Sequence, residues 1–332
     1  MRDAASAVLI AAVECFELTP DEERFFREES PAGVTLFRRN IPQDNYPQTA
    51  ILNQALQNTR SSGQPPLLVA IDQEGGRVSR IGAPFPNRGP AMQIEGGRTD
   101  RHALDSLRRY GSDVGKALWD IGVNVDFAPV LDVLTEPTNT AIGDRCFGVT
   151  PEQVSPRAGA FLEGLQSEKV LGCLKHFPGQ GNARVDTHLG SAIIDVSLQT
   201  LITREMAPFK ELIPKCPMVM ISHSIFPALC DHEASRSKII IMDWLRARLG
   251  FEGVVVSDDM NMGALPQEIA IWKDALIDAV AAGCDALLVC RHLDRCYAAL
   301  DALRAEANKS PAFAARLEDA ARRVTKMRST LR

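Results

Sequence analysis

Eight short apolar runs recur along the chain and constrain its fold more than any other feature. Each run is rich in β-branched residues and nearly continuous in its hydrophobicity, which is typical of strands buried on both faces of a parallel sheet. The runs cover residues 6–14, 33–37, 66–72, 123–130, 170–177, 217–224, 253–259 and 285–291. Stretches with the periodicity of amphipathic helices separate them.

Start and stop signals support the intervening helices. Thr19 and Asp100 are suited to cap helices that begin just after them, and Gly250 is suited to end one. Eight strands alternating with helices over 332 residues predict an α/β protein, a single-domain (β/α)8 TIM-like barrel covering residues 1–332. The alternative is an open, doubly wound sheet. Its dinucleotide-binding form is unsupported because no GxGxxG motif follows a strand.

Charge and cysteine usage narrow the class of protein. The net charge is −5 and no basic run occurs, which argues against a nucleic-acid partner. The eight cysteines form no CxxC pair and are expected to be reduced thiols of a cytoplasmic protein. Acidic Glu14 and Glu17 argue against a signal peptide, and no run of about 18 apolar residues predicts a membrane span. We expect a monomer with no membrane partner, although no motif determines the oligomeric state.

Polar residues follow several of the predicted strands directly. The segments "IDQEGGRVSR", "LKHFPGQG", "ISHS" and "VSDD" end four of the runs. Charged side chains after apolar strands are costly unless they face water or one another. Because a barrel carries its chemistry at the carboxyl ends of its strands, this repeated pattern predicts a polar site there.

The segment "VVVSDDMNMGA" places Asp258 and Asp259 after a fully apolar strand. One carboxylate could face the barrel mouth as a nucleophile or base, kept ionised by a cation such as Lys175. The alternative is that Ser257 or an aspartate caps the next helix. Gly75 and Gly76 permit a tight turn, either near a ligand or without functional meaning.

The loop "KHFPGQGNARVDTHLG" contains Asp186 and His188, two residues apart. A carboxylate beside an imidazole holds its tautomer and favours its protonated form, which yields a proton donor near neutral pH. A structural histidine is the alternative. A zinc site formed by His176, Asp186 and His188 is conceivable, but no HExxH motif accompanies it, and we expect no metal and no cofactor.

Three cations could bind a ligand near this loop. Lys175 lies at the end of a predicted strand, where a lysine is rarely buried without a partner. Together with Arg80 and Arg145 it could bind several hydroxyl groups or an anion. Surface salt bridges are the alternative for each cation. His223 is expected to be a core or supporting residue.

Five motifs in order resemble family 3 glycoside hydrolases. "KHFPGQGNARVDTH" resembles the KH(F/I)PGHG-x4-DSH loop of that family, and "VVVSDDMNMGA" resembles its nucleophile segment SDD(L/M)xM. "GVTLFRRNI", "IDQEGGRVSR" and "NTAIGDRCFG" resemble further signatures, so the likeness runs from about residue 8 to about residue 295. The single-domain length is similar to that of the bacterial β-N-acetylhexosaminidases of peptidoglycan recycling.

The resemblance implies a role for each matching residue. Asp258 is expected to be the nucleophile, His188 the general acid/base and Asp186 its dyad partner. The residues expected to bind the N-acetylglucosamine ring are Asp72, Arg80, Arg145, Lys175 and His176. The sequence departs from the family pattern at Gln180, where the family has the His of GHG, and at Thr187, where it has Ser.

The expected function is that of a retaining exo-β-N-acetylglucosaminidase. It would remove terminal N-acetylglucosamine from peptidoglycan fragments, the N-acetylglucosaminyl-anhydromuramyl peptides, through a covalent intermediate. A neutral imidazole base does not repel an anionic acceptor, so an N-acetylglucosaminide phosphorylase using the same site is an alternative. A sugar-binding protein without turnover is a second alternative, from another functional class.

Overall fold

Eight parallel strands close into a barrel in the computed structural model, which describes residues 3–183 and 192–331. Around the ring the strands follow the order β1-β10-β9-β8-β7-β6-β3-β2. Their bounds are β1 (Leu9–Ala12), β2 (Gly33–Leu36), β3 (Leu68–Ile71), β6 (Val125–Asp126), β7 (Leu171–Phe177), β8 (Met218–Ile221), β9 (Val254–Asp259) and β10 (Ala286–Leu288). Every strand lies within one of the eight predicted runs. Because β1 pairs with both β10 and β2, the ring is closed, and the open-sheet alternative is wrong.

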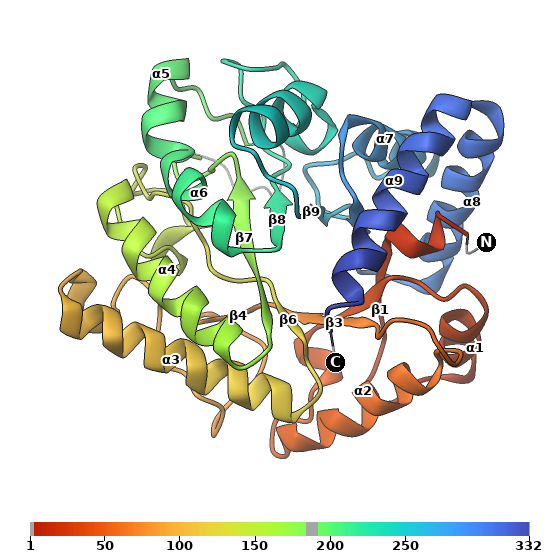
Figure 1. Cartoon of the computed structure of the whole chain (residues 1–332), viewed down its shortest axis with the longest axis horizontal. Helices are drawn as coiled ribbons and strands as arrows, with labels where there is room; N and C mark the ends of the chain where they lie inside the picture. The colour runs from red at the N-terminus through yellow and green to blue at the C-terminus, as the bar shows by residue number, and fades with distance from the viewer. Residues whose placement is uncertain (1–2, 184–191, 332) are drawn as a thin grey trace.

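Helices surround the barrel on its outside (Figure 1). They are α1 (Pro20–Glu28), α2 (Thr49–Asn58), α3 (Arg101–Asp120), α4 (Pro151–Ser167), α5 (Leu198–Thr200), α6 (Ala207–Leu212), α7 (Ile269–Ala282), α8 (Leu293–Lys309) and α9 (Pro311–Arg328), with a π-helix, η9 (Ile239–Arg248). Thr19 forms a capping box with Glu22 at the start of α1, and Asp100 accepts a hydrogen bond from Ala103 N at the start of α3. Gly250 follows η9 with a φ of 71°, a left-handed conformation that glycine adopts without steric cost. The predicted start and stop signals are confirmed.

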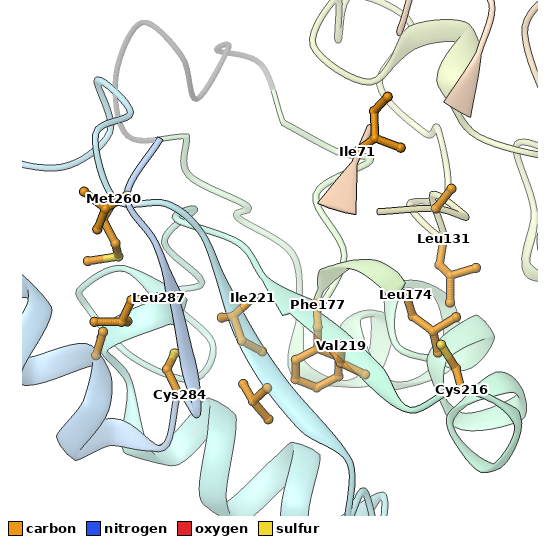
Figure 2. Packing of buried hydrophobic residues seen from close by; sticks show 14 of the residues in the cluster. Ile71, Leu131, Leu174, Phe177, Cys216, Val219, Ile221, Met260, Cys284 and Leu287 are labelled. Carbon is orange, nitrogen blue, oxygen red and sulfur yellow. The ribbon is translucent and has the colours of Figure 1, made fainter. Parts of the chain in front are cut away.

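Alternate residues of each strand face opposite sides of the barrel wall. In β8, Met218 and Met220 join the apolar cluster inside the barrel, whereas Val219 and Ile221 pack outward under the helices. Figure 2 shows Phe177, Val219 and Ile221 together in this outer layer. Both faces of the strands are therefore apolar, which explains why the runs read as continuous hydrophobic segments rather than alternating ones.

The end of α9 covers the barrel at the amino ends of its strands. Val324, Met327 and Leu331 belong to the same apolar cluster as the inward-facing strand residues. Met327 also lies in one surface hollow with Val254, the first residue of β9. This end of the barrel is thus closed by packing, and a ligand cavity is expected at the carboxyl ends.

Within the part of the chain that is described, no helix is both long and apolar enough to cross a lipid bilayer.

Candidate active site

A small polar cavity lies at the carboxyl ends of the strands. Every second residue of a strand faces the same side, and Leu68 and Ala70 of β3 face into the barrel, so Asp72 faces inward as well. Asp258 follows the inward-facing Val254 and Val256 of β9 in the same way. The cavity has a volume of about 240 Å³. The candidate residues that line it are Asp72, Arg80, Arg145, Lys175, His176 and Asp258. The structure therefore brings six of the eight candidates together, whereas Asp186 and His188 lie outside the described residues.

A larger hollow of about 1070 Å³ lies on the outer surface, between α4 and α6. It is lined by helix residues such as Glu163 and Lys210 rather than by residues at strand ends. Since barrel enzymes place their chemistry at the carboxyl ends of the strands, we assign the site to the smaller cavity.

Lys175 is the centre of the ion pairs at the cavity floor. It projects from β7, is only 1% exposed, and lies 2.7 Å from Asp72 Oδ1 and 2.6 Å from Glu74 Oε1 through its Nζ atom. Burial alone would lower the pKa of Lys175, but the two carboxylates outweigh burial and raise it, so the ammonium group stays charged. Within residues 3–183 and 192–331, Lys175 thus pairs with Asp72 and Glu74, and it forms no ion pair with Asp258, the residue it was expected to keep ionised.

Two arginines complete the charge balance of the two acids. Arg145 forms a two-pronged pair with Glu74, with its Nε and Nη2 atoms each 2.8 Å from a carboxylate oxygen. Arg80 reaches Asp72 Oδ2 at 3.0 Å. Such charge-assisted pairs hold both donor and acceptor in a fixed orientation. The simple surface-salt-bridge alternative is wrong for Lys175 and Arg145, whose side chains are 2% and 10% exposed.

The same cations set the ionisation of the acids. Burial would raise the pKa of Glu74, but Arg145 and Lys175 lower it to about 2. Burial would likewise raise the pKa of Asp72, and Lys175 and Arg80 hold it well below its usual range. Asp126, beneath them at the end of β6, has its pKa raised well above the usual range by burial. Asp72 and Glu74 therefore present charged carboxylate oxygens, the acceptors that sugar hydroxyl groups need.

His176 and the loop after it are held by Asp132. The Nδ1 atom of His176 is 2.7 Å from Asp132 Oδ2, and the backbone N–H of Gln180 donates to Asp132 Oδ1 at 2.7 Å. Asp132 is fully buried. One carboxylate thus fixes the ring plane of His176, which leaves its Nε2 atom for a ligand, and it also fixes the loop that leads toward residue 184.

The two aspartates at the end of β9 have different roles. Asp259 Oδ1 accepts hydrogen bonds from Asn261 N, Asn261 Nδ2 and Cys290 N, so it stabilises the turn after the strand. Asp258 instead lines the cavity. Neither residue caps α7, whose start has no side-chain cap, so the helix-cap alternative is wrong.

A hairpin after β3 carries Arg80 back over Asp72. Strands β4 (Gln73–Gly75) and β5 (Val78–Ser79) form it, and Gly75 and Gly76 make its turn with φ angles of 93° and 56°. A Cβ atom on Gly76 would approach Pro90 Cα to 2.8 Å, so this turn requires glycine. The predicted tight turn is confirmed.

Two residues of the site were missed by sequence reasoning. Glu74 stands two residues after Asp72 and so on the same face of an extended chain, a spacing that signals a second inward-facing acid. Asp132 is a single acid in the apolar segment "FAPVLDV", and a buried acid in such a segment needs partners. No group of three or more His, Cys, Asp or Glu residues suited to bind a metal ion occurs among residues 3–183 and 192–331.

Known proteins resemble this chain in sequence over most of its length. Residues 11–327 match the family model described as "Glycosyl hydrolase family 3 N terminal domain". The chain is 34% identical over 304 residues to a β-hexosaminidase of Tolumonas auensis, covering 89% of this chain and 86% of that protein.

Solved structures resemble the whole barrel. A β-N-acetylhexosaminidase from Beutenbergia cavernae is 30% identical with a TM-score of 0.88, and the match covers 98% of each chain. NagZ from Neisseria gonorrhoeae, in complex with N-trifluoroacetyl-D-glucosamine, is 30% identical with a TM-score of 0.79 over 90% of this chain and 83% of that chain. A family 3 β-N-acetylglucosaminidase from Paenibacillus sp. is 31% identical with a TM-score of 0.90, and the match covers 99% of this chain but 62% of that one.

Proposed function

The chain belongs to glycosyl hydrolase family 3, and on that premise we propose that it is a retaining exo-β-N-acetylglucosaminidase acting on peptidoglycan fragments. It is a glycoside hydrolase of the β-N-acetylhexosaminidase type. The proposal goes further in naming its substrate, the N-acetylglucosaminyl-anhydromuramyl peptides, and in assigning its catalytic residues.

The residues that surround Asp258 are the main support for the proposal. Asp258 lines a cavity whose other residues include two carboxylates, the partly buried Asp72 and the buried Glu74, which Lys175 and Arg145 hold. Charged acceptors and donors in fixed positions suit the ring hydroxyls of a sugar. The carboxylate of Asp258, which accepts one hydrogen bond from Asp259 N, suits attack on the anomeric carbon. The volume of about 240 Å³ is somewhat below that of pockets for drug-sized ligands, which fits one sugar residue and hence removal of terminal units.

In the proposed mechanism Asp258 attacks the anomeric carbon while His188 protonates the leaving oxygen. Asp186 holds His188 in the required tautomer and favours its protonated form. His188 then takes a proton from water, which attacks the glycosyl-enzyme and releases the sugar with its configuration retained. The proposal assigns Asp72, Arg80, Arg145, Lys175 and His176 to binding of the sugar ring.

Rates with paired aryl N-acetyl-β-glucosaminide and aryl β-glucoside substrates test the function. Release from the first at least about tenfold faster than from the second is expected, since a fitted acetamide contributes at least one hydrogen bond. The product should be the β-anomer of N-acetylglucosamine, seen first by proton NMR. Preference for the glucoside, or first appearance of the α-anomer, would contradict the proposal. A sugar 1-phosphate formed on addition of phosphate would indicate the phosphorylase instead.

A further inference from the structure

The side-chain amide of Gln180 is held in a single orientation at the edge of the cavity. Gln180 is 4% exposed, and its Oε1 atom accepts hydrogen bonds from Ser222 Oγ at 2.8 Å and Ser224 Oγ at 3.0 Å. Both serines follow β8 and are fully buried. Its backbone is fixed as well, through Asp132 on the N–H side and Asn139 Nδ2 on the carbonyl side.

The serines determine which end of the amide faces them. Ser222 Oγ already accepts a hydrogen bond from Ser224 N at 2.9 Å, so its own hydrogen needs an acceptor. With the amide reversed, both hydroxyl hydrogens would face an NH2 group, and each unpaired buried group costs about 1–3 kcal/mol. The oxygen of Gln180 must therefore point to the serines, and its Nε2 atom must point away from them.

The Nε2 atom is left with two hydrogens to donate. Within residues 3–183 and 192–331 no hydrogen bond from this atom is present, and Gln180 lines the same cavity as Asp258 and Met220. A donor that lines a cavity and has no protein partner there is available to a ligand or water. Asp72 and Glu74 are already paired with cations of the cavity, whereas this neutral donor has no partner within the described residues.

We propose that Gln180 is a specificity-determining residue whose Nε2–H donates a hydrogen bond to an oxygen of the sugar bound in the cavity. This inference rests on the proposed function, because the ligand it requires is the N-acetylglucosaminide. Because a primary amide does not titrate, the donor is independent of pH.

The substitution Gln180→Glu tests this role because it preserves shape and the acceptor for both serines. When protonated, the acid presents an O–H in place of the amide N–H; when ionised, it can only accept. Gln180→Glu should therefore approach wild-type kcat/KM at acid pH and lose about tenfold or more as pH rises through the pKa of the new carboxyl. The matched control is Gln57→Glu, the same exchange at a half-buried amide that bonds Leu67 on the amino side of β3, and its ratio to wild type should stay near one at all pH values.

Substrate variants separate a direct hydrogen bond from a general effect of charge. Aryl glycosides that lack one sugar oxygen at a time should include one whose about tenfold penalty in wild type disappears in Gln180→Glu at high pH. A charge acting on Asp258 at a distance would slow every glycoside by the same factor instead, and that result would overturn the proposal. A kcat/KM of Gln180→Glu that stays within twofold of wild type at every pH would also overturn the proposal.

The same role can also be tested in a protein that lacks both serine hydroxyls. If Gln180→Glu does not fold, Gln180→Met in the Ser222→Ala/Ser224→Ala protein removes the donor together with the hydroxyls that need an acceptor. The same glycosides are then compared against the double serine variant. If the wild-type protein does not hydrolyse N-acetylglucosaminides, both the proposed function and this inference are wrong. If it does, but no single sugar oxygen loses its penalty in the Gln180 variants, only this inference is wrong.

Discussion

The barrel contains a buried ion cluster at each end, and the two have different surroundings. At the amino end, Asp285 is fully buried and binds Arg246 at 2.5 Å and Arg316 at 2.8 Å, and it also accepts from Val255 N. This cluster joins η9, α9 and the starts of β9 and β10. At the carboxyl end, Asp72, Glu74 and Lys175 form a comparable cluster that borders the cavity.

Charge has a structural role in the cluster at the amino end and is available to a ligand in the cluster at the carboxyl end. Asp285 binds cations that reach it from two surrounding helices, so its pairs fasten those helices to the barrel. The acids at the other end receive their cations from residues of β7 and of two loops, and together they line the cavity. Substitutions at the amino end should therefore change stability, and those at the carboxyl end should change both stability and activity.

The largest effect is expected for Asp258→Asn. Removal of the nucleophile should lower kcat by at least about 10³-fold with little change in melting temperature, because catalysis depends on this group and packing does not. Steady-state kinetics and thermal denaturation measure the two effects. Turnover within tenfold of wild type would exclude Asp258 as the nucleophile.

Lys175→Met should impair both properties. It leaves two acids facing each other without their shared cation, which costs about 3–5 kcal/mol in unfolding free energy, and it misplaces the groups that bind the sugar, so kcat/KM should fall by about 10²-fold. The loss of stability should be larger at pH 7 than at pH 4, where the released acids can take up protons. Denaturant titrations at the two pH values check this, and equal losses at both would contradict the account.

Asp285→Asn is the counterpart at the closed end. It leaves Arg246 and Arg316 without their carboxylate and should also cost about 3–5 kcal/mol of unfolding free energy. Turnover measured well below the melting temperature should stay within about threefold of wild type, as expected for a residue that only fastens helices. A loss of activity as large as that of Lys175→Met would remove the distinction between the two clusters.

The pH dependence of stability offers a smaller test at Glu74. Its pKa is lowered from 4.5 to about 2 in the folded protein, so its stabilisation is present above pH 4.5 and is lost as pH falls toward 2. The shift corresponds to about 3 kcal/mol. Relative to wild type, Glu74→Gln should be destabilised at pH 6 and nearly equal in stability at pH 2. A difference that does not depend on pH would show that Glu74 is not held by charge.

The smallest effect is expected for Arg80→Lys. Arg80 is partly exposed and contacts both Asp72 and the ring of Phe37, and lysine keeps its charge but not its planar geometry. KM should rise about three- to tenfold, kcat should change less, and stability should change by no more than about 1 kcal/mol, as for exposed pairs. An unchanged KM would remove Arg80 from the sugar-binding residues.

Much of this architecture could be predicted from local sequence. The eight runs locate eight strands, because strands buried on both faces need continuous apolar residues. The period of two then places Asp72, Lys175 and Asp258 on the inner face. Glu74 and Asp132 were missed since their importance comes from partners far along the chain, Arg145 in one case and His176 in the other. Pairings over such distances have no local signal in the sequence. For the same reason, the residues next to Lys175 do not reveal that it pairs with Asp72 and Glu74.

Mass analysis of the His188→Ala protein tests most directly whether Asp258 forms the covalent glycosyl-enzyme. Without its base, breakdown of the glycosyl-enzyme should be slow, so an aryl N-acetyl-β-glucosaminide with a good leaving group should let the intermediate accumulate. After acid quenching and proteolysis, the account predicts one N-acetylhexosamine residue attached to the peptide at Asp258. Attachment at Asp259 or elsewhere, or no attachment together with an inverted product, would contradict it.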